Sequence, residues 1–147
     1  MSARIDTEVV EARLRELSRR LRRVAAKKPA SLKELASDED LQDILTRNLE
    51  LAIQACVDVA AHLCGTFGVV PSTSAEAFDL LAKRGVLERG LARRMRRAVG
   101  FRNILVHEYV TVDWKIVMRV LNRDTRDLAA FGKAMLALTT SPRQKSK

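Results

Sequence analysis

The chain contains 147 residues, with 27 Lys and Arg against 18 Asp and Glu and a formal net charge of +9 at neutral pH. Hydrophobic residues make up 47% of the chain but aromatic residues only 4%, and Gly (6) and Pro (3) are few. This composition argues against a turn-rich sheet and predicts one all-α domain with an aliphatic core. The excess of positive charge favours a polyanionic partner such as RNA, DNA or an acidic protein.

The same composition argues against membrane, secreted and zinc-binding classes of protein. The chain has no run of about 18 or more uncharged apolar residues, and acidic residues near its start argue against a signal peptide. We therefore expect a cytoplasmic protein that does not bind a membrane. Cys56 and Cys64 lie on one predicted helix and zinc-finger spacing is absent, so we expect buried thiols, no metal and no cofactor.

Residues 4–28 are predicted to form the first helix, because apolar residues repeat along them at spacings of three and four. These residues are Val10, Leu14, Leu17, Leu21 and Val24. The pattern is typical of a helix in a bundle. The other faces of this helix are densely basic, which fits either a solvated surface or an electrostatic platform for RNA phosphates.

A second helix is predicted over residues 39–63, with Asp38 placed to cap its start. Two apolar lines run along this helix, which favours a central position in the bundle or a dimer seam. Asp58 lies on the remaining side, and two interpretations of it stay open. It either fixes His62 or receives an arginine from another helix, or it pairs with Arg102 and orients that guanidinium.

A short helix is predicted over residues 74–85, and a longer one from about residue 88 into the segment 100–109. Four arginines lie off the apolar side of this longer helix: Arg93, Arg94, Arg96 and Arg97. They form the strongest local basic feature of the chain, which fits RNA binding or a solvated face. The last helix is predicted over residues 113–138, where Asp124 falls on the apolar side and needs a donor from another helix.

These elements predict an antiparallel helical bundle of four long helices plus a short one, paired into a two-fold homodimer. We expect residues 1–139 to form a single domain, because no internal repeat or linker divides the chain. Residues 140–147 contain a proline and several basic residues and are expected to be a disordered tail.

The end of the fourth predicted helix concentrates the polar chemistry of the chain. Four functional groups fall within eight residues there: Arg102, Asn103, His107 and Tyr109. Asn103 and His107 are four positions apart and share a helix face, so both can touch one ligand. Arg102 and His107 are five apart, which points them about 140° away from each other on a regular helix. They reach one phosphate only if the helix loosens near Val106 or if each works with its counterpart from a second chain, and we favour the second.

The run Arg-Asn-x-Leu-x-His-x-Tyr at residues 102–109 resembles the Arg-x4-6-His signature of the HEPN superfamily. More closely, it resembles the Arg-x4-His-x-Tyr form of HepT-like toxins encoded beside minimal nucleotidyltransferase antitoxins. Residues 51–62 are similar to the second helix of that family, and the likeness covers most of residues 4–139. The resemblance implies a ribonuclease toxin with a cognate minimal nucleotidyltransferase as its partner. It also implies that Tyr109 is the residue on which that transferase places AMP.

Together with this resemblance, the residue types at the site lead us to expect metal-independent cleavage of RNA, either tRNA or mRNA. His107 titrates near neutral pH and suits proton transfer, and the forked guanidinium of Arg102 fits phosphate oxygens. A second histidine from a partner chain would allow one imidazole to act as base and the other as acid. Asn103 and Asp58 are predicted supporting residues, and the four arginines before the motif are predicted to bind RNA.

Two other functions stay open. The first is a catalytically silent HEPN module that binds a nucleotide or serves as a scaffold for a nucleotidyltransferase. The second is a basic helical adaptor that binds RNA without chemistry. The adaptor predicts loss of function when the four arginines are removed, but tolerance of His107→Ala.

Overall fold

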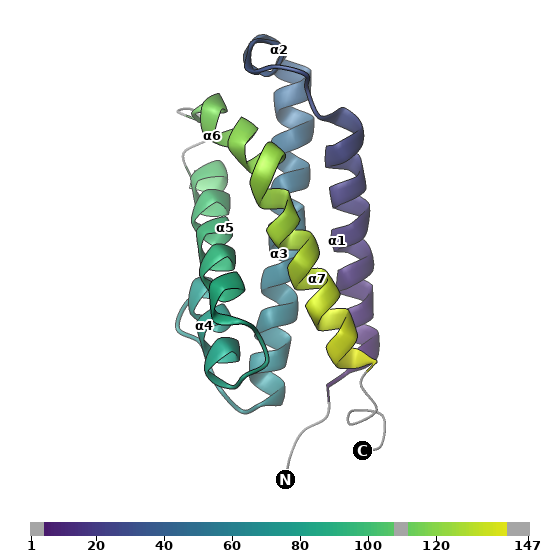
Figure 1. The fold of residues 1–147 in the computed structure, drawn as a ribbon, viewed down its shortest axis with the longest axis vertical. Coiled ribbons are helices and arrows are strands. Elements are labelled where there is room, and N and C mark those ends of the chain that lie inside the picture. Colours follow the sequence, from purple (N-terminus) through teal and green to yellow (C-terminus); the bar gives the residue numbers. More distant parts are fainter. Residues whose placement is uncertain (1–4, 108–111, 141–147) are drawn as a thin grey trace.

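The computed structural model describes residues 5–107 and 112–140, and every secondary-structure element within these two ranges is helical. The elements are α1 (Thr7–Lys27), α2 (Leu32–Ser37), α3 (Glu39–Thr66), α4 (Ser74–Lys83), α5 (Arg89–His107), α6 (Trp114–Arg119), a π-helical segment (Val120–Asp124) and α7 (Thr125–Thr139). Four long rods alternate in direction along the chain, namely α1, α3, α5 and the continuous rod formed by α6, the π-helical segment and α7 (Figure 1). The prediction of an antiparallel all-α bundle is confirmed.

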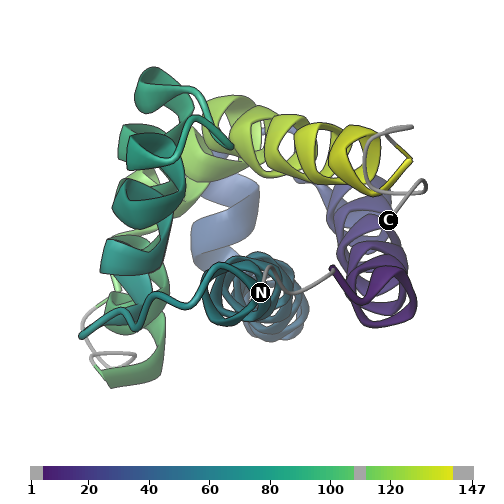
Figure 2. The ribbon, with the colours of Figure 1, turned by 90° about the horizontal axis from the view of Figure 1, so that it is seen from below.

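The helix α3 lies at the centre of this arrangement. It packs against α1, α4, α5 and α7, and in the end-on view it lies between α5 and α1, with α7 across from it (Figure 2). Both of its predicted apolar lines are buried, including Leu49, Cys56 and Ile53. The width of its buried face therefore reflects a central position in the bundle, which was one of the two interpretations of its sequence.

By length and composition alone, α3 is the single helix in residues 5–107 and 112–140 that fits a membrane span. Its mean hydropathy reaches 1.2 over an 18-residue window. However, 56% of that window is buried inside the protein, and its neighbours are the other helices of the bundle. The apolar character of α3 is therefore accounted for by packing in the bundle core.

Side-chain caps set the starts of most helices. The carboxylate of Asp38 accepts a hydrogen bond from the Leu41 amide at 3.0 Å, and that of Asp113 accepts one from the Lys115 amide at 2.9 Å. These contacts satisfy amide groups that have no partner within the helix. The start of α4 was predicted at Ser74, and the structure shows that Thr73 is its capping residue.

Three phenylalanines, Phe78, Phe101 and Phe131, and both cysteines are buried in the core. Phe78 of α4 and Phe131 of α7 meet edge to face, with ring centroids 5.4 Å apart, an arrangement that adds roughly 0.5–1.5 kcal/mol beyond burial alone. Cys56 and Cys64 are buried and unbridged, as expected. Burial raises the pKa of the Cys56 thiol well above its usual range, so this group stays neutral and unreactive in the folded chain.

The structure differs from the predicted elements in two places. No helix was predicted between residues 28 and 39, but the segment after Pro29 forms the helix α2, capped by Ser31. The last helix was predicted to be continuous, but its hydrogen bonding widens to a π-helix over Val120–Asp124. No Gly or Pro marks this segment, so local sequence rules gave no signal for it.

Candidate active site

The described part of the polar motif, Arg102 to His107, occupies the last two turns of α5. This helix turns its apolar face to the bundle through Leu91, Met95 and Val99, which are all buried. Arg102 is half-buried, whereas Asn103 and His107 are exposed. The motif therefore lies where the rigid, packed part of α5 reaches the surface.

Two apolar side chains near the motif face solvent. Val106 is 43% exposed, and the nearby Ile104 is 40% exposed. Phe101 and Leu105 are the residues of this part of α5 that face the core, and Phe101 is only 8% exposed. The motif is thus flanked by two exposed apolar side chains.

The guanidinium of Arg102 is held by two neutral amide groups. Its Nη1 donates a hydrogen bond to Oε1 of Gln54 on α3 at 2.6 Å, and its Nη2 donates one to Oδ1 of Asn103 at 2.9 Å. Neither acceptor carries a charge. The arginine is therefore fixed in orientation while its positive charge is not neutralised by these contacts.

A chain of polar contacts continues from Arg102 across three helices. Nε2 of Gln54 donates to Oδ1 of Asp58 at 2.8 Å, and the second oxygen of Asp58 lies 3.8 Å from Nε of Arg13 on α1. The direct pairing of Asp58 with Arg102 is therefore wrong, because Gln54 stands between them. The other interpretation of Asp58, that it receives an arginine from another helix, is confirmed.

His62 takes no part in this polar chain among the described residues. Its Nε2 accepts a hydrogen bond from the backbone amide of Asp6 at 3.3 Å, close to the start of α1. This contact gives His62 a local structural role at the base of the bundle. The suggestion that Asp58 fixes His62 is not supported by any contact between residues 5–107 and 112–140.

The helix α5 continues without interruption through His107. Loosening of the helix near Val106, one of the two routes by which Arg102 and His107 could meet, is therefore absent. A regular helix separates the two residues by about 7.5 Å along its axis and about 140° around it. Tyr109 lies outside the described residues, so the structure gives no account of it.

The four arginines that precede the motif fall into two groups. Arg94 makes an ion pair with Asp127 at 2.8 Å, and Arg96 makes one with Asp79 at 2.7 Å. Arg93 and Arg97 are exposed, and neither lies within ion-pairing distance of an acid in the described part of the chain. Much of this basic cluster therefore ties α5 to α4 and α7.

The residue that sequence reasoning missed is Gln54. A signal for it existed, because Gln54 and Asp58 are polar positions four apart on a helix that is otherwise largely apolar. Across residues 5–107 and 112–140, no group of three or more His, Cys, Asp or Glu side chains is placed to hold a metal ion.

Comparison with known proteins assigns the chain to a family. The family described as Ribonuclease HepT-like matches residues 8–135. A protein named mRNA nuclease HepT from Shewanella oneidensis is 31% identical over 99 residues, which cover 67% of this chain and 74% of that protein. One named tRNA nuclease HepT from Aphanizomenon flos-aquae is 34% identical over 110 residues, covering 74% of this chain and 75% of that protein.

Solved structures show the same relationship. A tri-AMPylated HEPN toxin of Shewanella oneidensis, in complex with an MNT antitoxin, superimposes with a TM-score of 0.82 and 26% identity, covering 88% of this chain and 97% of the other. The chain thus belongs to the ribonuclease HepT-like family of HEPN proteins. The predictions of that family and of an enzyme of the endoribonuclease class are confirmed.

We expect Gln54→Leu to lower the kcat of RNA cleavage by at least about tenfold while changing KM less, because it removes the acceptor that orients Arg102. The matched control is Gln42→Leu, which removes a hydrogen bond of 2.8 Å to the carbonyl of Leu35. Equal losses of kcat in the two variants would contradict a positioning role for Gln54.

Proposed function

We propose that this chain is a metal-independent endoribonuclease toxin whose active site is formed by the α5 ends of two chains. The observation that carries the proposal is the state of Arg102, which is held by Gln54 and Asn103 with its charge available to a phosphate. The substrate is RNA, and we propose mRNA or tRNA because relatives are named as nucleases of these two classes.

The proposed chemistry uses the 2′-hydroxyl of RNA as the nucleophile. A base removes the proton of this hydroxyl, its oxygen bonds to phosphorus, and the bond from phosphorus to the 5′-oxygen breaks as that oxygen receives a proton. His107 suits these proton transfers, because imidazole takes and releases protons near neutral pH. The fork of Arg102 offers donors to the phosphate oxygens, on which negative charge builds in the transition state.

The geometry of α5 supports a site shared between two chains. Because the helix stays regular through His107, Arg102 and His107 of one chain point in nearly opposed directions. A two-fold axis close to the end of α5 would bring Arg102 of one chain and His107 of the other to the same phosphate. Ile104 and Val106, exposed at 40% and 43%, flank these residues and supply apolar surface for such a pairing.

The remaining predicted site residues have supporting roles in this proposal. Asn103 holds Arg102 through its oxygen, and its position four residues before His107 lets its amide group face the same substrate. Asp58 acts one step further away by orienting Gln54. Arg93 and Arg97 are proposed to contact RNA phosphates, whereas the ion-paired Arg94 and Arg96 add to the local positive field.

We further propose that a cognate minimal nucleotidyltransferase neutralises the toxin by transferring AMP to Tyr109. The support is the Arg-x4-His-x-Tyr motif together with the relative solved as a tri-AMPylated toxin in complex with an MNT antitoxin. An adenylyl group on Tyr109 adds negative charge and bulk two residues from His107. It would compete with the substrate phosphate for Arg102.

We expect His107→Ala to reduce the rate of RNA cleavage by at least about 100-fold, since it removes the proton-transfer group, while RNA binding changes little. Single-turnover cleavage of total tRNA and mRNA by nuclease-free preparations measures the rate, and fluorescence anisotropy measures binding. Because His107 is exposed, its replacement leaves the packing of the core unchanged, and a thermal melt checks this directly. Cleavage at the parental rate would contradict the proposal, and loss of function only in an Arg93→Ala/Arg97→Ala variant would favour a binding adaptor.

Co-expression with the cognate nucleotidyltransferase is expected to add one or more AMP units to the chain and to suppress cleavage. Intact-mass and peptide mass spectrometry locate the modification, and Tyr109→Phe is the matched control, because it keeps the ring but lacks the acceptor oxygen. Suppression of toxicity with Tyr109 unmodified would contradict this mode of neutralisation.

A further inference from the structure

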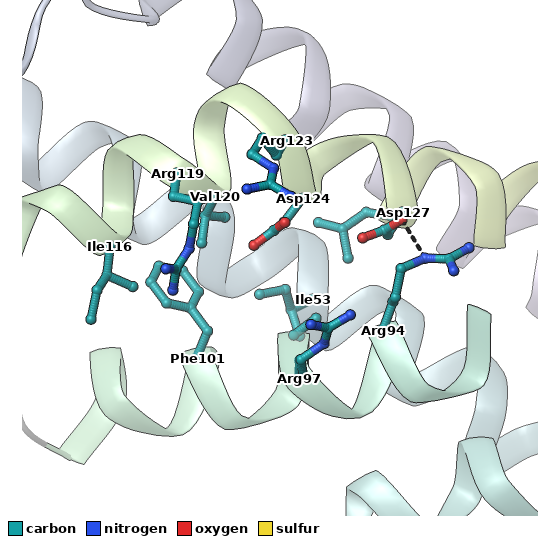
Figure 3. Close-up of a pocket in the computed structure, with 12 residues that line it drawn as sticks. Ile53, Arg94, Arg97, Phe101, Ile116, Arg119, Val120, Arg123, Asp124 and Asp127 are labelled. Atoms are coloured by element: carbon teal, nitrogen blue, oxygen red, sulfur yellow. Dashed lines mark hydrogen bonds and ion pairs between the residues drawn. The ribbon is translucent and has the colours of Figure 1, made fainter. Parts of the chain in front are cut away.

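A polar pocket lies between α5 and the rod formed by α6, the π-helical segment and α7 (Figure 3). Its volume is about 320 Å³, which is at the lower end of the range for pockets that hold small molecules. Its lining comprises Ile53, Arg94, Arg97, Ala98, Phe101, Ile116, Arg119, Val120, Arg123, Asp124, Asp127 and Leu128. Neither Arg102 nor His107 belongs to it.

The pocket has an apolar floor and a charged rim. Ile53, Phe101 and Leu128 form part of the floor and are buried, at 1%, 8% and 1% exposure. Arg97, on α5, points toward the opposite rod, whereas Arg119 and Asp124 point from that rod toward α5 (Figure 3). A ligand seated here would meet a flat apolar surface below and guanidinium groups above.

The charges around the pocket do not balance. Four arginines face two aspartates, and the 2.8 Å ion pair between Arg94 and Asp127 uses one of each. Within residues 5–107 and 112–140, no acid lies within ion-pairing distance of Arg97, Arg119 or Arg123, and Asp124 is likewise without an ion pair. Grouped like charges repel one another, and an anion placed among them offsets this cost.

The backbone of the pocket wall is also unusual. Val120, Arg123 and Asp124 all belong to the π-helical segment, which interrupts an otherwise α-helical rod. Such π-helical turns are rare and are found frequently at functional sites. The π-helical segment therefore carries two of the charged residues that have no ion pair in the described ranges, Arg123 and Asp124.

We propose that this pocket binds a nucleotide unit, with its phosphate on the guanidinium groups and its base on the apolar floor. Guanidinium forks match phosphate oxygens, and both Phe101 and the arginine planes offer stacking surfaces for a base. The carboxylate of Asp124 is an acceptor for an exocyclic amine or a ribose hydroxyl. The unit comes either from a free mononucleotide or from a single-stranded RNA, and the two sources share this chemistry.

The test compares two double variants that remove equal charge. Arg119→Ala/Arg123→Ala alters the pocket, and Lys33→Ala/Lys83→Ala alters exposed lysines of α2 and α4 that do not line it. Each is made in the full chain carrying His107→Ala, so that RNA stays intact during the measurement. The probes are 5′-AMP and inorganic phosphate, measured by isothermal titration, and a fluorescent single-stranded RNA, measured by anisotropy.

The pocket variant is expected to weaken binding of 5′-AMP or of RNA by at least about tenfold relative to the lysine control variant. If the pocket variant loses affinity for RNA alone, the ligand is a nucleotide unit within an RNA strand. If it loses affinity for 5′-AMP, the ligand is a free nucleotide. Equal affinities of the two variants for every probe would overturn the proposal. The pocket shares no residue with the cleavage motif, and all binding is measured in chains that carry His107→Ala. The binding result therefore does not depend on whether His107 catalyses cleavage.

Discussion

The site depends on a hydrogen bond between a charged group and a neutral one. Arg102 is anchored to α3 by the amide oxygen of Gln54 at 2.6 Å rather than by a carboxylate. A carboxylate in that place would fix the guanidinium equally well but would also cancel its charge. Asp58 lies one step further along the contact chain, where Arg13 offsets its charge. The arrangement gives a phosphate an oriented cation, which is the property that electrostatic catalysis needs.

The same helix that carries this arginine also limits what one chain can do alone. The helix α5 is regular up to its last residue, His107, so it cannot turn that imidazole toward Arg102. Its rigidity follows from the buried face of Leu91, Met95 and Val99 against the bundle. A rigid helix with the two proposed catalytic groups on opposed sides is well suited to pairing across a two-fold axis. The exposed apolar residues beside the motif are consistent with that arrangement.

Sequence periodicity predicted the bundle because long amphipathic helices leave little freedom in how their apolar faces are buried. The central place of α3 was one of the two interpretations of its two apolar lines, and Asp38 was predicted as the cap of that helix from its position alone. The π-helical segment was not predictable, since it arises from packing and carries no Gly or Pro. The contact between Gln54 and Arg102 joins positions 48 apart, and no local pattern specifies which partner an arginine chooses across helices. For the same reason, the ion pairs that hold Arg94 and Arg96 were not foreseen.

A complementation experiment tests the shared site most directly. Arg102→Ala and His107→Ala chains are co-expressed with different affinity tags, and the mixed dimer is isolated through both tags. No chain in this dimer carries both groups, so any cleavage must come from an arginine and a histidine of different chains. We predict that the mixed dimer cleaves RNA faster than either single-variant protein. A mixed dimer no more active than the two variants alone would contradict a site formed between chains.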